Sequence, residues 1–263
     1  MTMSEKQIME QGDLHYQSIR ACTPVIPPSH LYPDMDYEDA YAIAGVIVEH
    51  YIADGYTIAG KKVGLTSNAM RKLGGIFEPD YGMIFNELCY SNESHISAAK
   101  FVQPGVEAEI GFRLKADLVG TGITPEDVLR ATEYVVPCLE LVDVRQKMDV
   151  PRKVFDSIAD NASFGAYVIG DTPIPPYEID LGLIGYVFEQ NNQQVEVACG
   201  AAVLDHPANA IAWLANRFSS IGNPLRAGEF VLSGSAITMK MAKAGDHFRC
   251  RYGRFGEVSV SFI

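Results

Sequence analysis

The chain has 263 residues, of which 48% are hydrophobic and 21% charged, a composition typical of a soluble globular protein. Its formal net charge of −12 argues against a nucleic-acid partner, because phosphate backbones require clustered lysine and arginine. The 5 cysteines form no Cys-x-x-Cys pair, and no run approaches the roughly 18 apolar residues of a membrane span. With an N-terminus unlike a signal peptide, these features predict a cytoplasmic protein.

The first quarter of the chain is predicted to be helical. Ser4 is placed to cap a helix that reaches about residue 21, and Asp36 to cap a second helix that ends near Ala53. The prolines within 23–33 interrupt regular structure, because each one removes a backbone donor and restricts its predecessor. We therefore expect an N-terminal helical segment, residues 1–57, attached to a larger domain, residues 58–263, in one compact unit.

Short strands separated by glycines follow from residue 58. A strand over 60–66 is expected to run into a helix over 68–73 that starts at Ser67, and residues 78–82 have turn composition. Asp205 is predicted to cap a helix that reaches Phe218. Further expected elements are a helix opening at 124, a hairpin over 183–198, and strands at 229–232, 236–240, 247–252 and 257–263. Strands that outnumber helices without alternating with them favour a β-rich α+β fold with a rolled or sandwiched sheet.

Two of the expected strands carry carboxylates. Apolar residues alternate with Glu107 and Glu109 over 106–114, and the two-residue period of a strand points both glutamates to one face. A Glu-x-Glu pair alone more often marks a solvated face. Glu140, however, lies in an apolar run in which an ionised carboxylate requires a cationic partner. Three such carboxylates indicate a divalent cation held by oxygen ligands.

Other common catalytic motifs are absent from the sequence. There is no Gly-x-Ser-x-Gly, no His-Glu-x-x-His, and no Gly-x-x-x-x-Gly-Lys followed by the Ser or Thr of a phosphate-binding loop. The 6 histidines are isolated, which argues against a histidine-rich zinc site. The remaining oxygen-ligand chemistry favours magnesium, manganese or calcium over softer metals.

Six motifs, in order along the chain, resemble those of the 2-hydroxyalka-2,4-dienoate and 2-oxohept-4-ene-1,7-dioate hydratases. This family lies in the hydratase and decarboxylase branch of the fumarylacetoacetate hydrolase superfamily, and the resemblance extends from about residue 34 to the end. It implies the mixed β-roll of that superfamily as a catalytic domain over 58–263, preceded by helices. The motifs are Gly-Lys-Lys-Val-Gly-Leu-Thr-Ser (60–67), Glu-Pro-Asp-Tyr-Gly (78–82), Val-Glu-Ala-Glu-Ile (106–110), Pro-Cys-Leu-Glu-Leu (137–141), Asp-Asn-Ala-Ser (160–163) and Asp-His-Pro-Ala-Asn (205–209).

The resemblance also implies roles for individual residues. Glu107, Glu109 and Glu140 match the metal-binding carboxylates of the superfamily, so the expected cofactor is Mg²⁺ or Mn²⁺. Lys62 and Asp80 match the acid/base groups of these hydratases, and the assignment of acid and base between them stays open.

Substrate contacts are predicted at two places. Thr66, Ser67 and Ser235 are candidates to bind the carboxylate of a 2-oxo acid, because they lie beside glycine in expected loops. Arg152 is a candidate to meet a second carboxylate, as the segment after Pro151 resembles that of the heptenedioate hydratases.

The implied reaction adds water to a 2-hydroxy-2,4-dienoate or its 2-oxo-4-enoate tautomer and gives a 4-hydroxy-2-oxo acid in a meta-cleavage pathway for aromatic compounds. The substrate stays open between a pentadienoate and a heptene-1,7-dioate. Two alternatives are a 4-oxalocrotonate decarboxylase of the same fold and a non-catalytic partner subunit. Asp80 favours hydration, because those decarboxylases lack an aspartate at this position. The resemblance further implies a homo-oligomer and an association with a sister decarboxylase.

Overall fold

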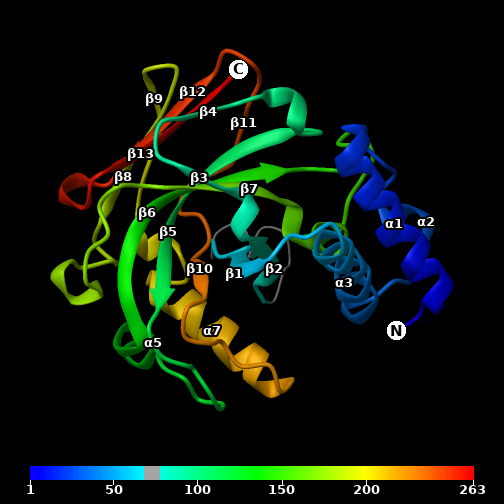
Figure 1. Cartoon of the computed structure of the whole chain (residues 1–263), viewed down its shortest axis with the longest axis horizontal. Coiled ribbons are helices and arrows are strands. Elements are labelled where there is room, and N and C mark those ends of the chain that lie inside the picture. The colour runs from blue at the N-terminus through cyan, green and yellow to red at the C-terminus, as the bar shows by residue number, and fades with distance from the viewer. Residues whose placement is uncertain (68–77) are drawn as a thin grey trace.

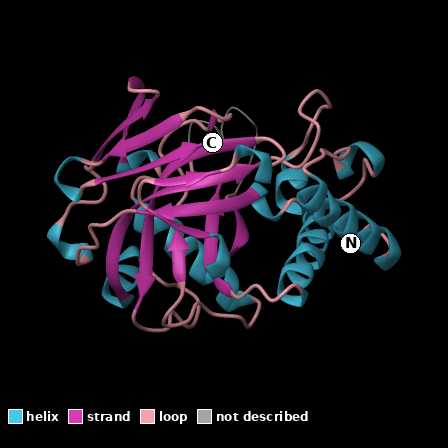
Figure 2. Cartoon of the chain, turned by 45° about the horizontal axis from the view of Figure 1, so that its top comes forward, coloured by secondary structure: helices cyan, strands magenta, loops and turns pink. Residues whose placement is uncertain are grey.

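The computed structural model describes residues 1–67 and 78–263, and the helix expected over 68–73 lies outside them. The N-terminal helices form one side of the molecule and the β-sheets form the other (Figures 1 and 2). Helix α1 (Glu5–Ala21) is capped by Ser4 and helix α3 (Tyr37–Ala53) by Asp36, as predicted. The expectation of no regular structure within 23–33 is wrong, because α2 (Pro28–Leu31) forms there with proline at its first position, where no backbone donor is needed.

The larger sheet is organised around the antiparallel pair β5 and β6. Its strand order is β2-β1-β10-β5-β6-β7-β3, and β11 pairs with β5 beside this path. The pair is central, so both faces of β5 are largely buried and not one face only, as the alternating pattern suggested. The strands are β1 (Ile58–Gly64), β2 (Asp80–Phe85), β3 (Cys89–Ser91), β5 (Pro104–Leu114), β6 (Thr132–Asp143), β7 (Phe164–Ile169), β10 (Phe230–Leu232) and β11 (Lys240–Met241).

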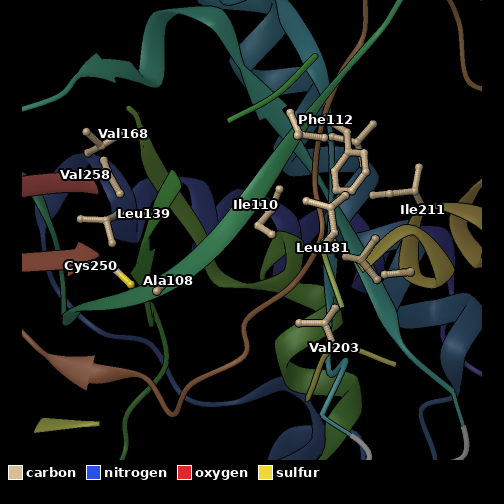
Figure 3. Close-up of a cluster of buried hydrophobic side chains, with 14 of the residues drawn as sticks. Ala108, Ile110, Phe112, Leu139, Val168, Leu181, Val203, Ile211, Cys250 and Val258 are labelled. Atoms are coloured by element: carbon tan, nitrogen blue, oxygen red, sulfur yellow. The ribbon is translucent and has the colours of Figure 1, made fainter. Parts of the chain in front are cut away.

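The smaller sheet has the order β4-β13-β12-β8-β9 and packs on the larger one. It contains the predicted hairpin, whose turn residues Asn191 and Asn192 have φ of 54° and 63°, the left-handed conformation that asparagine tolerates. Figure 3 shows Ala108 of β5 beside Cys250 in the core between the sheets. The strands are β4 (Ser94–Ile96), β8 (Gly185–Gln190), β9 (Gln193–Cys199), β12 (His247–Arg251) and β13 (Glu257–Phe262).

The remaining helices pack around the sheets. α5 (Pro125–Ala131) is capped by Thr124, and Ile211 of α7 (Pro207–Ser220) packs on the core of Figure 3. α6 (Val154–Ala159) lies between β6 and β7 in the chain. Short 3₁₀ turns complete the described elements: η1 (Asn86–Leu88), η2 (Ala98–Lys100), η3 (Asn161–Ser163), η4 (Pro176–Glu178), η5 (Gly200–Ala202) and η6 (Gly253–Phe255).

Three local predictions are wrong. His206 and not Asp205 caps α7, because its Nδ1 accepts a hydrogen bond of 3.1 Å from the Ala208 N–H. The segment 78–82 is not a turn throughout, since Asp80 already pairs with Gly64 at the start of β2. The strand expected over 236–240 is confined to Lys240–Met241, which pairs with β5.

The overall class agrees with the prediction of a β-rich α+β fold with mixed, curled sheets. The N-terminal helices and the sheets share a buried cluster, so their packing does not mark a boundary at residue 57. The division of the chain there stays a prediction. In the part of the chain that is described, no helix has both the length and the apolar character needed to cross a bilayer. All five cysteines are free thiols.

Candidate active site

The three predicted glutamates converge at the middle of the larger sheet. Glu107 and Glu109 lie on one face of β5, and Glu140 of β6 is paired directly with Glu107, so its side chain points to the same face. One carboxylate oxygen from each glutamate lies within 4.8 Å of the others. Glu109 and Glu140 are fully buried and Glu107 is half-buried. The register of one strand pair is therefore sufficient to assemble the cluster.

The hydrogen bonding of these glutamates is incomplete. Glu109 accepts a bond of 2.8 Å from the Gly234 N–H through Oε2, but its Oε1 and the Oε2 of Glu140 are buried without a partner among the described residues. Burial, followed by repulsion from Glu140, raises the pKa of Glu107 to about 7 and that of Glu109 well above its usual range. Buried carboxylates that lack donors and repel one another fit a bound divalent cation.

Lys62 is the cation that faces this cluster. Its Nζ donates to Oε1 of Glu140 at 2.5 Å and to the Ala162 carbonyl at 2.8 Å, whereas the neighbouring Lys61 pairs with Glu229. Burial lowers the pKa of Lys62, but the opposing attraction of Glu140 and the other acidic groups prevails and raises it to about 12.

Asp80 lies diagonally across from Lys62 on the same face of the sheet. Gly64 of β1 is opposite Asp80, and Lys62 is two residues before Gly64. Both oxygens of Asp80 are buried without a well-formed hydrogen bond among the described residues. Burial raises its pKa to about 6, against the effect of Lys62 and a weak interaction with Ser157. A Cβ on Gly64 would lie 2.0 Å from Oδ1 of Asp80, so this approach requires glycine.

The carbonyl that binds Lys62 belongs to an unusual turn. Asn161, Ala162 and Ser163 have φ of 51°, 50° and 53°, and non-glycine residues pay for this left-handed conformation with strain. The turn is held by Asp160, whose Oδ1 is 2.5 Å from Nε of the buried Arg145. The sequence motif marked this corner but did not indicate its conformation.

A cavity of about 360 Å³ opens over this site. Lys62, Asp80, Glu107 and Arg152 are among its lining residues, and Arg152 has no hydrogen bond or ion pair within the described ranges. The sequence analysis gave no role to the other lining residues, although four of them stand in the motifs at 60–67 and 160–163; they are Gly64, Leu65, Val142, Val144, Lys153, Val154, Ser157, Ala162, Ser163 and Met239.

The remaining candidates for substrate binding do not line this cavity. The Ser235 hydroxyl accepts from the Ile237 N–H at 3.2 Å and lies 2.9 Å from the Ile237 carbonyl, and Thr66 Oγ1 lies 3.5 Å from the Ser235 carbonyl. Ser67 forms a β-bridge with Val203. Their roles in substrate binding stay predictions.

The family of the chain follows from comparison with known proteins. Residues 52–262 match the fumarylacetoacetate (FAA) hydrolase C-terminal family. The chain belongs to this family, and its strands place the three glutamates in one cluster.

The most similar relatives narrow the class further. The chain is 40% identical over 260 residues to a 2-keto-4-pentenoate hydratase of Paraburkholderia xenovorans, a match that covers 99% of this chain and 96% of the relative. It is 39% identical to the 2-oxo-hept-4-ene-1,7-dioate hydratase of Escherichia coli, with 98% and 96% covered. The structure of 4-oxalocrotonate decarboxylase from Pseudomonas putida G7, complexed with magnesium and adipate, superposes with a TM-score of 0.95 at 31% identity and covers 100% of this chain and 99% of the decarboxylase. The predicted resemblance to this branch is confirmed.

Proposed function

We propose that this protein is a divalent-metal-dependent hydratase that adds water to a 2-hydroxy-2,4-dienoate, through its 2-oxo-4-enoate tautomer, and yields a 4-hydroxy-2-oxo acid. The observation that carries the proposal is the cluster of Glu107, Glu109 and Glu140 beside Lys62 and Asp80 at one cavity. The full-length similarity to hydratases of meta-cleavage intermediates supports the same reaction and pathway.

The three glutamates would hold Mg²⁺ or Mn²⁺, hard ions that prefer carboxylate oxygens. Once bound, such an ion supplies electrostatic stabilisation for negative charge on the oxygens of a 2-oxo acid. Magnesium in the decarboxylase of the same fold supports this choice of ion.

Asp80 and Lys62 are suited to opposite proton transfers. Asp80 is acceptor-only when ionised and its oxygens have no well-formed hydrogen bond among the described residues, so we assign it as the base that takes the proton of the attacking water. Lys62 sits between two acceptors, Glu140 and the Ala162 carbonyl, and an ammonium has a third N–H to offer. We assign Lys62 as the donor that protonates the carbon chain. The π bond of one C=C and one O–H bond of water break, C–O and C–H bonds form, and the proton gained by Asp80 balances the one lost by Lys62.

The alternatives explain less of the site. Decarboxylation needs no base for water. Asp80, however, is a buried carboxylate that lines the cavity and has no well-formed hydrogen bond among the described residues. A non-catalytic subunit would not need the complete set of acidic and basic groups. Identity is also higher to the hydratases, at 40%, than to the decarboxylase, at 31%.

Substrate orientation is assigned to Arg152 in the cavity and to three residues outside its lining. Arg152 would bind a second carboxylate, while Thr66, Ser67 and Ser235 would contribute to the carboxylate end through their loops. We further propose a cytoplasmic homo-oligomer that can associate with a sister decarboxylase; the free thiols are compatible with a reducing compartment.

The experiment is a product assay of the purified protein with Mg²⁺ or Mn²⁺. 2-Hydroxypenta-2,4-dienoate and 2-oxohept-4-ene-1,7-dioate are supplied separately, and mass spectrometry should detect addition of one water without carbon dioxide. Carbon dioxide release would move the assignment to the decarboxylase. No consumption of either compound, or of 4-oxalocrotonate, would favour the partner subunit.

The variant Arg152→Ala separates the two substrates in the same assay. We expect KM for the heptenedioate to rise about tenfold, the typical loss for one charged hydrogen bond, with KM for the pentadienoate unchanged. An equal rise in KM for the two substrates would mean that Arg152 does not bind a second carboxylate.

A further inference from the structure

Helix α6 forms one wall of the cavity but is too short to be stable without contacts to other segments. Val154 and Ser157 of α6, with Arg152 and Lys153 just before it, line the cavity. The helix has 6 residues, far fewer than an isolated helix needs in water. Its position must therefore come from contacts with other parts of the chain.

The face of α6 turned away from the cavity is buried among the N-terminal helices. Ile158 and Ala159 belong to a cluster formed otherwise by residues of the first 46, including Ile43 of α3. The ring of Phe155 packs edge-on against Tyr37, with centroids 4.9 Å apart. One short helix thus faces substrate space on one side and the N-terminal segment on the other.

A buried hydrogen-bond cluster fixes α6 to α2. The carboxylate of Asp156, with no exposed surface, accepts from the Ser29 N–H at 2.8 Å, from the Ser29 hydroxyl at 2.6 Å and from the Lys153 N–H at 2.7 Å. Its two oxygens therefore connect Ser29 of the N-terminal segment to Lys153, the residue just before α6. Ser29 is itself buried, so water does not compete for these bonds.

Two further tethers act on the same helix. The Gln146 side chain donates to the Asp156 carbonyl at 2.7 Å and lies 3.0 Å from Nε2 of His15 in α1. Nζ of Lys153 donates to the Pro33 carbonyl at 2.9 Å, whereas Arg152 has no such bond within the described parts of the chain. The N-terminal partners in the three tethers, Ser29, His15 and Pro33, all precede residue 52, where the match to the family begins.

We propose that Asp156, held by Ser29, is a positioning residue for substrate, and that the N-terminal helices set the place of the basic wall relative to the glutamates. The inference rests on the proposed function in that it requires 2-oxo acids to occupy this cavity. It adds that substrate fit, and not metal binding, depends on a segment outside the matched domain. A loss of the Asp156–Ser29 contact shifts Arg152 and Ser157 while the glutamates of β5 and β6 stay in register.

The test compares Ser29→Ala with Ser18→Ala. Both hydroxyls are buried in the N-terminal segment, but that of Ser18 donates to the Thr23 carbonyl at 2.7 Å, with a longer contact of 3.5 Å to the Arg145 carbonyl, and not to α6. Affinity of the Mn²⁺-loaded protein for 2-oxoadipate, an unreactive two-acid probe, is measured by calorimetry together with Mn²⁺ affinity and thermal stability. We expect Ser29→Ala to weaken 2-oxoadipate binding about fivefold to twentyfold with Mn²⁺ affinity unchanged, and Ser18→Ala to leave both affinities unchanged.

A double-mutant cycle with Asp156→Asn identifies the contact itself. Asp156→Asn replaces one of the two acceptor oxygens by an NH₂ that cannot accept from the donors it faces, and its effect on 2-oxoadipate should not add to that of Ser29→Ala. The inference is overturned if Ser29→Ala behaves like Ser18→Ala, or if Ser29→Ala lowers the affinity for Mn²⁺ as much as that for 2-oxoadipate. It is also overturned if the effects of Ser29→Ala and Asp156→Asn add fully, or if the wild type does not bind 2-oxoadipate. Binding of the probe without turnover of dienoates would instead refute the proposed function alone.

Discussion

The two sides of the cavity are built in different ways. The glutamates stand on β5 and β6, a continuous antiparallel ladder in which Glu107 is paired directly with Glu140. The opposite wall consists of the short helix α6 and the left-handed turn η3, which depend on side chains from distant segments such as Arg145 and Ser29. The comparison shows that the hydrogen bonds between two strands orient the proposed metal-binding side chains. The residues proposed to contact substrate depend instead on contacts with segments distant in the chain. Changes on the two sides should accordingly produce separable defects.

The largest effect is expected on the ladder side, from Glu109→Gln. The amide keeps the bond from Gly234 but loses the charge, so Mn²⁺ affinity should fall strongly and metal-dependent turnover should fall below detection. The metal-free variant should melt at a higher temperature than the wild type, because one buried carboxylate no longer repels its neighbours. Added Mn²⁺ should raise the melting temperature of the wild type only.

The matched control is Glu189→Gln, which removes a carboxylate paired with Arg249 and Arg251 outside the cavity. This variant should keep metal affinity and turnover. Retained Mn²⁺ affinity in Glu109→Gln would instead remove Glu109 from the ligand set.

A smaller effect is expected from Asp80→Asn, on β2 at one end of the same sheet. Loss of a general base should lower kcat on the order of 10³-fold while Mn²⁺ affinity stays unchanged. Because the pKa of Asp80 is raised to about 6, wild-type kcat/KM should decline as the pH falls through that value and the base becomes protonated. The residual activity of Asp80→Asn should lack this decline, and a decline that persists would assign the titration to another group.

The smallest effect concerns pH and metal affinity. The pKa of Glu107 is raised to about 7 without a metal, so Mn²⁺ must displace a proton at lower pH. Affinity should fall about tenfold per pH unit below 7 for each proton displaced, and calorimetry in buffers of different ionisation enthalpy should detect its release. If the Mn²⁺ affinity does not change between pH 6 and 8, this account of the cluster is contradicted.

Much of the fold follows from local pattern. The alternation over β5 placed Glu107 and Glu109 on one face, and the cap residues Ser4 and Asp36 marked the starts of α1 and α3. These features are predictable because a strand has a period of two and an orphan helix donor needs a nearby acceptor. Glu140 was recognised as needing a cation, since a charge in an apolar run is costly.

The choice of partner was made only by tertiary structure. Lys61 and Lys62 are adjacent and chemically identical, and only the pairing of β1 sends Lys62 to Glu140 and Lys61 to Glu229. Asp80 had turn composition, yet its pairing with Gly64 makes it a strand residue facing the cavity.

The basic wall is the clearest case of what tertiary structure alone decides. Nothing in the sequence around Asp156 indicates that Ser29 lies against it, because the two are 127 residues apart in the chain. The sequence by itself determined which residue types are available and which face of a strand or helix each one takes. Distances between segments were decided by the packing of the helices and sheets, since contacts of large sequence separation leave no periodic signal in the chain.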